Sequence, residues 1–377
     1  MMVRPIMALV LAVAACWPAV VAAQPGDLPL LESPKGLGLI YSERDPAAAP
    51  LTDRAWQMAI KRGVNSYQLT VPWDQIALPD GTPDMTYVEP LLDLLQQSGL
   101  QVYFTLQSVD TTALRLPAVL MDPTNPRRLR PDLSFDSPEV IGHLTALLDE
   151  LVPLLAQRGG FALSLANEVD IYLSINPDQT LPLAVFAEFG RVHGKSLEPD
   201  MRFGVTLTHK AMANPDLTLL MMSVSDAAIF TYYPLDGNVE NPAVIDFDFD
   251  SMEAFAGGRP IILQEAGVPG APADGSPSVI GASDELQRQW VEAVYREVRE
   301  RESIRFVSWL HLADWPADVI DFFQQYYGLS EPDFVEFLSG LGLMTDQGVA
   351  RPALRELMIQ LRRTSRPAVQ STTRATP

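Results

Sequence analysis

Two glutamates of this sequence follow short apolar segments. Glu168 comes after FALSLA and Asn167, and Glu265 comes directly after PIILQ. A buried strand that ends on a carboxylate places that group at the edge of a sheet, where it can contact a ligand. Glycosidic bond cleavage needs two such groups, a protonated acid beside the leaving oxygen and an ionised carboxylate beside the anomeric carbon. Repulsion between two nearby carboxylates separates their pKa values, so identical side chains can take these opposite roles.

The hydrophobic pattern predicts the elements that position these glutamates. Strands are expected at 36–41, 66–71, 101–107, 161–166, 202–208, 227–232, 260–264 and 306–310. Helices are expected at 53–62, 87–98, 138–158, 181–198 and 283–301, with shorter helices at 214–223 and 251–255. Strands that are apolar on both faces and alternate with helices are typical of a parallel sheet covered by helices. Eight such units in 377 residues predict an α/β fold, a single-domain (β/α)8 TIM barrel.

An open, doubly wound sheet is the structural alternative to a barrel. No Gly-x-Gly-x-x-Gly turn follows the first expected strand, where a nucleotide-binding sheet would carry one. In a barrel, the active face lies at the carboxyl ends of the strands. Glu168 follows the fourth expected strand and Glu265 follows the seventh, across the ring from it. We therefore expect the two carboxylates to converge on one bond.

These strand ends resemble those of the superfamily of retaining (β/α)8 glycoside hydrolases, the clan A type. In that superfamily the acid/base glutamate follows strand four in an Asn-Glu pair, and the nucleophile follows strand seven. The stretch GLMTDQGVARPALREL is also similar to the superfamily's usual ending, and the resemblance spans 36–362. It implies that Glu168 is the acid/base, that Glu265 is the nucleophile and that Asn167 holds the sugar 2-hydroxyl.

The resemblance also implies roles for aromatic residues at other strand ends. Tyr232 in FTYYP matches the tyrosine that donates a hydrogen bond to the nucleophile; Tyr233 is the alternative, because neighbouring strand residues point to opposite faces. Trp309 matches the tryptophan that forms a floor for the sugar ring, although a large residue could instead fill the barrel interior. Trp73 is a candidate sugar platform, and a role in capping the barrel fits it equally well.

Some family features are absent from the sequence. Several families of the superfamily carry a histidine on strand three and a His-x-Tyr on strand six, where this chain has Gln107 and Phe230 or Thr231. The substrate therefore stays open. No metal site is expected, since no His-x-His or His-Glu-x-x-His spacing occurs, and no Gly-x-Ser-x-Gly elbow indicates a serine nucleophile. The proposed chemistry requires no cofactor.

Composition limits the class of partner. A hydrophobic content of 47% and a charged content of 20% are typical of a globular protein with a large core. The formal net charge of −20 opposes binding to nucleic acid, because phosphate contacts need clustered Lys and Arg. No apolar segment after the N-terminus reaches the length that spans a bilayer. We expect a monomer whose partner is an oligo- or polysaccharide substrate.

The N-terminus has the pattern of a secretory signal peptide. Arg4 precedes an uncharged apolar run, and Val-Ala-Ala before Gln24 fits a cleavage site. Val-Ala-Ala-Cys, which ends at Cys16, resembles a bacterial lipobox, so a lipid anchor at Cys16 is the alternative. The expected organisation is a signal peptide at 1–23, a catalytic barrel at 24–362 and a disordered tail at 363–377. The expected location is secreted or periplasmic.

The sequence thus predicts a secreted hydrolase that cleaves glycosidic bonds with retention through a covalent glycosyl-enzyme intermediate. The main alternative is a barrel that keeps the carboxylate pair but binds carbohydrate or protein without cleaving it, because a fold does not dictate a function. A hydrolase of another bond, such as an ester, is a further alternative.

Overall fold

The computed structural model describes residues 35–41 and 46–365. Its parallel strands are β1 (Gly36–Leu39), β2 (Ser66–Pro72), β3 (Gln101–Gln107), β8 (Gly160–Ser164), β9 (Arg202–Gly204), β10 (Thr206–Thr208), β11 (Ala228–Tyr232), β14 (Ile261–Ala266) and β15 (Ile304–Trp309). They form two hydrogen-bonded sheets, in the orders β2-β3-β8-β9 and β1-β15-β14-β11-β10. Because β9 and β10 are halves of the fifth strand, the sheets join into the predicted (β/α)8 barrel.

Asn65 closes the other junction of the barrel, between β1 and β2. Its side-chain oxygen accepts from the Leu37 backbone N–H at 2.7 Å, and its own N–H donates to the Leu37 carbonyl at 3.1 Å. On the opposite side, Leu165 donates to the Gly204 carbonyl and Thr206 donates to the Ala166 carbonyl. These bonds continue the ladder where β8 and the fifth strand lose regular pairing, so the ring is closed on both sides.

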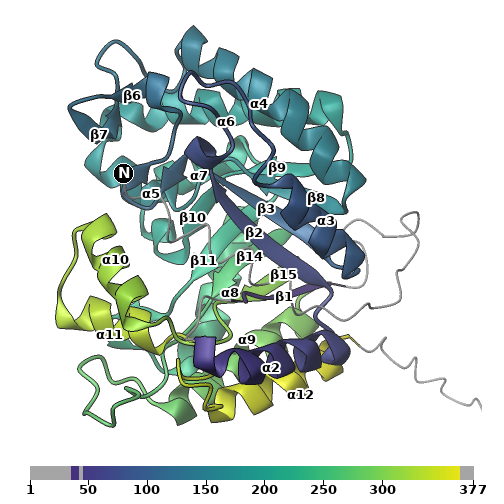
Figure 1. Cartoon of the computed structure of the whole chain (residues 1–377), viewed down its shortest axis with the longest axis vertical. Coiled ribbons are helices and arrows are strands. Elements are labelled where there is room, and N and C mark those ends of the chain that lie inside the picture. The colour runs from purple at the N-terminus through teal and green to yellow at the C-terminus, as the bar shows by residue number, and fades with distance from the viewer. Residues whose placement is uncertain (1–34, 42–45, 366–377) are drawn as a thin grey trace, which may run out of the picture.

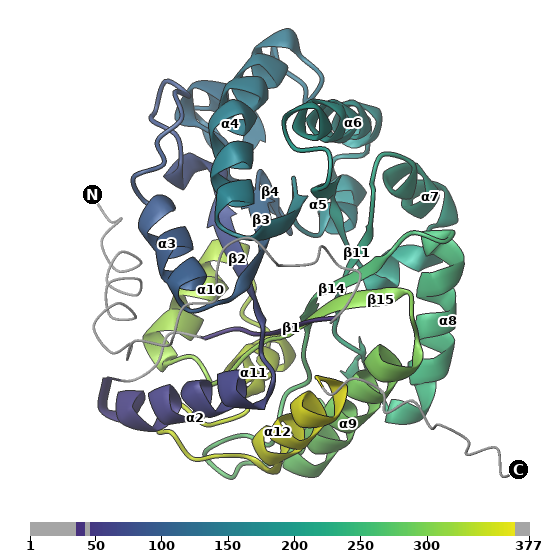
Figure 2. The same ribbon diagram turned by 90° about the vertical axis from the view of Figure 1, so that its right-hand side faces the viewer.

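A ring of helices covers the outside of the strands (Figure 2). In chain order they are α2 (Ala49–Arg62), α3 (Glu89–Gln97), α4 (Pro138–Gln157), α6 (Thr180–Leu197), α7 (Pro215–Ser223), α8 (Ile245–Ala256), α9 (Asp284–Glu300) and α12 (Pro352–Thr364). Each predicted helix has a counterpart, but α8 is longer than expected. Its alternating Asp and Phe residues obscure a helical spacing of buried positions: Ile245, Phe249, Met252 and Ala256.

Several connections at the carboxyl ends of the strands carry structure of their own (Figure 1). The loop after β3 holds the strand pairs β4 (Val109–Asp110) with β5 (Ala113–Leu114) and β6 (Met121–Asp122) with β7 (Asn125–Leu129). The short helix α5 (Val169–Ile175) follows β8, and the pair β12 (Leu235–Asp236) and β13 (Asn238–Val239) follows β11. Helices α10 (Ala317–Tyr327) and α11 (Pro332–Gly340), inserted between β15 and α12, were not predicted.

The barrel interior is layered along its axis. Near the amino ends of the strands, the rings of Tyr103, Phe161 and Phe306 pack with centroids 5.3 to 6.3 Å apart. The ring of Phe306 also explains a glycine in β1, since a Cβ on Gly36 would lie 2.7 Å from its Cδ2. Above this apolar floor lies a polar layer around Gln264, and the two glutamates lie above it. The interior is therefore a packed core that becomes polar toward the active face.

Most residues of the two chain ends lie outside the part of the chain that the structure describes. Residues 1–34, which include the expected signal peptide and Cys16, and residues 366–377 are outside the described residues. Helix α12 extends to Thr364, so the first two residues of the tail predicted at 363–377 are helical instead. Within 35–41 and 46–365, no helix has the length and apolarity of a membrane span.

Candidate active site

A β-bulge in β14 turns two consecutive side chains into the barrel. Phe230 pairs with Leu263, but the next residue, Thr231, pairs with Glu265, so Gln264 is an extra residue in the ladder. In a regular strand, Gln264 and Glu265 would point to opposite faces. Here the Gln264 side chain contacts the interior layer, and the Glu265 carboxylate lies at the mouth of the barrel.

Glu265 accepts hydrogen bonds on both carboxylate oxygens. Oε2 accepts from the hydroxyl of Tyr233 at 2.7 Å, and Oε1 accepts from Nε2 of Gln68 at 3.0 Å and of Gln264 at 3.4 Å. The two amide groups can donate through nitrogen but cannot accept there, so they pair with the ionised carboxylate. Burial raises the pKa of Glu265, and these donors oppose that rise.

Glu168 enters the same space from the end of β8. Its Oε1 accepts from the hydroxyl of Thr231 at 2.7 Å, and its Oε2 accepts from the hydroxyl of Thr111 at 2.7 Å. Glu168 and Thr111 are the two non-glycine residues with positive φ in the described chain, at 48° and 55°. Such backbone strain is concentrated at functional sites in proteins. Two strained loop residues, joined by a hydrogen bond, therefore aim this carboxylate.

Burial, together with the negative charge of Glu265, raises the pKa of Glu168 to about 8. Both hydrogen-bond partners of Glu168 are hydroxyls, which can accept from a protonated carboxyl as well as donate to an ionised one. Glu265, by contrast, has amide donors that favour its ionised form. The pair can hold one proton on Glu168 and a charge on Glu265 near neutral pH, the division that acid/base and nucleophile roles require.

Gln264 connects Glu265 to the asparagine of the Asn-Glu pair. Its Nε2 donates to Oδ1 of Asn167 at 2.7 Å, and its own oxygen accepts from the hydroxyls of Tyr103 and Thr206 at 2.7 and 2.5 Å. Nδ2 of Asn167 lies 3.4 Å from Oδ1 of Asp110. This buried network fixes the side-chain amide of Asn167 and joins it through Gln264 to Glu265.

The prediction that Tyr232 donates to the nucleophile is wrong. Its ring is buried in the outer core against Phe249 and Trp290, and its hydroxyl donates to Asp248 at 2.8 Å. Tyr233, the alternative, makes the contact with Glu265 instead. Side chains alternate along β11, and Thr231 already faces Glu168, so Tyr232 faces the helices and Tyr233 faces the mouth.

Neither tryptophan predicted to contact sugar has an accessible ring. Trp73 is 0% exposed and packs against Phe186 in the core, which corrects its assignment as a platform. Trp309 ends β15, opposite Leu39 and Ala266, and so lies at the expected rim. Its side chain is also 0% exposed, so in this structure it fills the interior and offers no face to a sugar.

Several residues at the site were not predicted: Gln68, Asp110, Thr111 and Tyr326. Gln68 lies within an expected strand, and nothing in the sequence marks it as a site residue among its neighbours. Asp110 follows β3, at the strand end where a functional side chain is expected in a barrel, so its position was the available signal. Tyr326 belongs to α10, a helix that the sequence analysis did not assign.

The two histidines near strand ends are buried, and within the described residues neither hydrogen-bonds to Glu168 or Glu265. His209 packs against Tyr232, and His311 stacks on Trp315 with ring centroids 4.3 Å apart. Burial lowers the pKa of each imidazole to about 3. Among the described residues, no group of three His, Cys, Asp or Glu side chains has an arrangement that could hold a metal ion.

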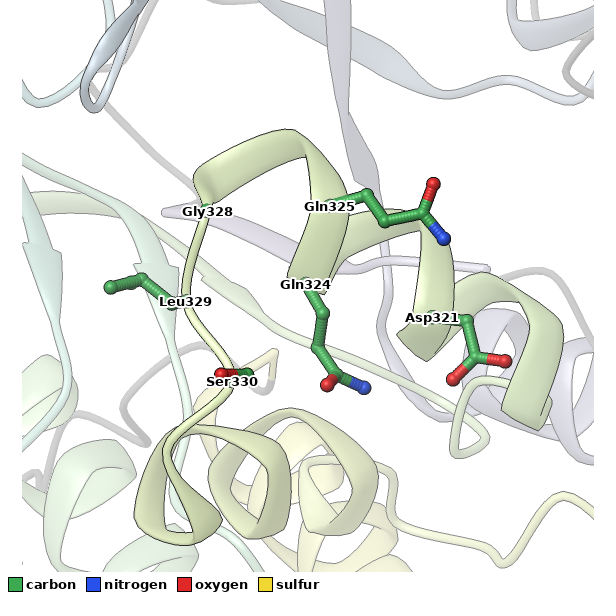
Figure 3. Close-up of a pocket in the computed structure, with 6 residues that line it drawn as sticks. All are labelled: Asp321, Gln324, Gln325, Gly328, Leu329 and Ser330. Atoms are coloured by element: carbon green, nitrogen blue, oxygen red, sulfur yellow. The ribbon is translucent and has the colours of Figure 1, made fainter.

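A separate hollow of about 330 Å³ lies on α10 and the turn that follows it (Figure 3). It is lined by Asp321, Gln324, Gln325, Gly328, Leu329 and Ser330. None of these residues belongs to the carboxylate cluster, so this hollow is not the candidate active site.

The structure is thus a (β/α)8 barrel with two glutamates at the carboxyl ends of its strands. No protein-family model matches the sequence, and no curated protein matches it. Solved structures do match most of the chain. A GH5_18 variant from Bifidobacterium longum subsp. longum, in complex with Manb1-4GlcNAc, superposes with a TM-score of 0.66 at 14% identity, over 87% of this chain and 78% of that chain.

Two further structures agree with this likeness. A GH5_18 variant from Streptomyces cattleya, also in complex with Manb1-4GlcNAc, has a TM-score of 0.65 at 19% identity, over 89% of this chain and 82% of that chain. The exo-beta-1,4-mannosidase Op5Man5 from Opitutaceae bacterium strain TAV5 has a TM-score of 0.64 at 17% identity, over 88% of this chain and 60% of that chain. At these identities the likeness establishes the barrel fold.

Proposed function

We propose that this protein is a retaining glycoside hydrolase with Glu168 as the acid/base and Glu265 as the nucleophile. The observation that carries the proposal is the pair of carboxylates at one barrel mouth with opposite surroundings. Glu168, with a raised pKa and hydroxyl partners, is suited to hold a proton, and Glu265, with three donors, is suited to stay ionised. The barrel fold shared with the GH5_18 structures supports the same function.

The reaction has two displacement steps. In the first, Glu265 attacks the anomeric carbon, the glycosidic C–O bond breaks, and the Glu168 proton moves to the leaving oxygen. In the second, Glu168 takes a proton from water, the water oxygen bonds to the anomeric carbon, and the ester to Glu265 breaks. Asn167, held by Gln264, is placed to bind the sugar 2-hydroxyl. Tyr233 keeps Glu265 ionised and oriented before the attack.

We propose β-mannosides as the first substrates to test. The two GH5_18 structures hold Manb1-4GlcNAc, and Op5Man5 is named as an exo-beta-1,4-mannosidase. The sequence departures at Gln107 and Phe230 leave the choice of sugar to experiment. A panel should therefore include 4-nitrophenyl β-mannoside, β-glucoside, β-galactoside and β-glucuronide, together with β-1,4-mannobiose.

The test compares the wild type with Glu168→Gln and Glu265→Gln on the panel. Both variants should lose turnover by at least about 10³-fold and keep the wild-type circular dichroism spectrum, because each lacks one essential group. Exposed Glu300 supplies the matched control, since Glu300→Gln should leave rates unchanged. If the wild type binds a sugar but cleaves no member of the panel, the non-catalytic alternative is supported. Near-normal rates in either variant contradict the assignment of that residue.

We also propose that the chain is exported and acts as a monomer. The proposal is supported by the signal-peptide pattern before Gln24. Mass spectrometry of the mature protein from a bacterial host distinguishes a start at Gln24 from a lipidated start at Cys16. A start at Met1 would contradict export, and size-exclusion chromatography tests the oligomeric state.

A further inference from the structure

Helices α10 and α11 lie outside the ring of barrel helices, on the side of the molecule that carries the β6–β7 hairpin (Figure 1). They lie between β15 and α12, the last barrel helix, and no strand separates them, whereas the barrel helices alternate with strands. Their aromatic residues contact one another and form a cluster: Phe322, Phe323, Tyr326, Tyr327 and Phe334. We call residues 317–340 the α10–α11 insertion.

The α10–α11 insertion is attached to the strand-three side of the mouth through Tyr326. The Tyr326 hydroxyl donates to Oδ2 of Asp110 at 2.8 Å, and the Tyr326 carbonyl accepts from the guanidinium of Arg127 at 2.8 Å. The guanidinium of Arg115 lies over the Tyr326 ring at 5.8 Å, and a bidentate pair with Asp74 fixes Arg115 in turn. Three contacts from the loop after β3 therefore hold one residue of α10, and Asp74, from the loop after β2, fixes one of the three partners.

The insertion also reaches the opposite side of the mouth. The ring of Phe337 in α11 meets the ring of Tyr233 edge-on, with centroids 5.3 Å apart. Tyr233 is the residue that donates to Glu265. The insertion therefore spans the mouth, from the end of β3 to the end of β11.

Asp110 connects the insertion to the candidate catalytic residues. This carboxylate is 5% exposed, and it accepts from Tyr326 on Oδ2 and lies 3.4 Å from Nδ2 of Asn167 on Oδ1. A backbone bridge also pairs Asp110 with Asn167. Burial raises the pKa of Asp110, since the donors that surround it only partly offset its desolvation. A shift of α10 would therefore move Asp110 and, through it, Asn167 of the Asn-Glu pair.

Tyr327, the last residue of α10, is half-buried, and its ring contacts that of Tyr326 at the mouth, with centroids 4.9 Å apart. Burial raises the pKa of Tyr327 well above its ordinary value, and the charges of Asp110, Glu168 and Glu265 add to that rise. Its ring stacks on Phe323 with an interplanar angle of 14°, and its edge meets Tyr326 and Phe334. A half-buried aromatic ring with a hydroxyl, on a helix that lies across the mouth, suits a sugar, which presents both C–H surface and hydroxyls.

We propose that the α10–α11 insertion forms part of the substrate site, with Tyr327 as a specificity-determining residue that contacts the sugar held between Glu168 and Glu265. Tyr326 and Asp110 are positioning residues that hold α10 at the mouth. This proposal rests on the proposed function. It adds an aromatic surface for the sugar, which neither Trp309 nor Trp73 can supply because both rings are buried. It implies that the sugar binds against an aromatic surface supplied by the last βα connection of the barrel.

The test measures kcat and KM of Tyr327→Phe, Tyr327→Ala and Tyr326→Phe on the aryl glycoside that the wild type cleaves best. Tyr327→Ala should lower kcat/KM by roughly tenfold or more, and Tyr327→Phe should raise KM by about threefold or more. Tyr326→Phe should raise KM with a smaller change in kcat, since it loosens α10 without touching the reacting atoms. Exposed Gln325 on the same helix gives the control, and Gln325→Ala should match the wild type.

Two results would overturn the proposal. If Tyr327→Ala and Tyr327→Phe both keep kcat and KM within twofold of the wild type, Tyr327 does not contact the sugar. If the wild type cleaves no glycoside, the proposed function fails separately, and calorimetric titration with β-1,4-mannobiose then decides the inference. Weaker binding by Tyr327→Ala supports the inference without catalysis; equal binding, or no binding by the wild type, overturns it.

Discussion

The hydroxyl of Tyr233 donates to Oε2 of Glu265 at 2.7 Å. This bond stabilises the ionised carboxylate, whose pKa burial would otherwise raise further. The neighbouring Tyr232 points the other way, to Asp248. The two adjacent tyrosines therefore provide a matched pair for separating a functional contact from a structural one.

Tyr233→Phe should lower kcat/KM by about 10- to 100-fold, because a hydrogen bond to a charged group contributes roughly 1.5–3 kcal/mol. Tyr232→Phe should leave kcat/KM near the wild-type value and lower the free energy of unfolding by about 1 kcal/mol, since it loses one bond to Asp248. Steady-state kinetics and urea denaturation of both variants check this. The reverse pattern would restore Tyr232 as the partner of the nucleophile.

The pH dependence of activity should follow the carboxylate pair. Activity should fall as the pH rises past about 8, where Glu168 loses the proton that the leaving oxygen needs. It should fall on the acid side as Glu265 becomes protonated, at a pH above the ordinary glutamate pKa. A pH profile of kcat/KM measures both limbs. With a 2,4-dinitrophenyl glycoside, which needs no acid, the basic limb should weaken; an unchanged basic limb would mean that another group sets it.

The raised pKa of Glu168 also predicts how stability changes with pH. Below the pKa of the unfolded chain, near 4.5, both states hold the proton and the shift has no effect. Between that pH and about 8 the folded state keeps a proton that the unfolded state releases, so the folded protein loses stability as the pH rises.

Glu168→Gln removes this cost. Its advantage over the wild type in free energy of unfolding should be small at pH 4, should grow through the window and should reach at least about 1 kcal/mol at pH 8. Urea denaturation at several pH values measures it. An advantage that is constant with pH would show that Glu168 titrates normally.

The guanidinium of Arg351 contacts residues from three different loops: Asp314, Gly342 and Ala271. Arg351 is 4% exposed, its guanidinium bonds Asp314 at 2.7 Å, and Nε lies 3.2 Å from Asp284. Burial raises the pKa of Asp314 to about 7, with Arg351 opposing the rise. Arg351→Met leaves a buried carboxylate without its partner and should cost about 3–5 kcal/mol of stability at pH 8.

This cost should shrink as the pH falls, because the loss of Arg351 raises the pKa of Asp314 further and the buried carboxyl then takes up a proton in the variant. The double variant Arg351→Met with Asp314→Asn should recover part of the loss, because no charge stays buried. Urea denaturation of the single and double variants checks both statements. A single-variant loss below 1 kcal/mol would contradict a structural role for the pair.

The barrel and its two glutamates could be predicted because both follow from patterns of neighbouring residues in the sequence. Apolar segments of strand length and helices of regular period identify the ring, and Glu168 and Glu265 follow their strands directly. The orientation of single side chains could not be predicted so well. The bulge at Gln264 shifts the alternation of β14 by one residue, and nothing in PIILQEAG distinguishes a bulged strand from a regular one.

The sequence also did not predict which side chains come together from distant loops. Trp73 and Trp309 match the expected positions, but their exposure depends on what packs over them, and both rings are enclosed. The alternation of strands and helices in a barrel does not predict the two extra helices α10 and α11. The positions of Tyr326 and Tyr327 could therefore not be predicted either. Contacts such as Tyr326 with Asp110 join residues more than two hundred positions apart, and periodicity carries no information about them.

Trapping of the covalent intermediate tests whether Glu265 is the nucleophile. The wild type is incubated with the 2-deoxy-2-fluoro glycosyl fluoride of the sugar it cleaves, and the digested protein is mapped by mass spectrometry. If Glu265 forms the glycosyl ester, the peptide that contains it should gain one fluoroglycosyl group, with loss of activity in step with labelling. A label on another residue, or continued hydrolysis with inversion at the anomeric carbon and no label, would contradict this role of Glu265.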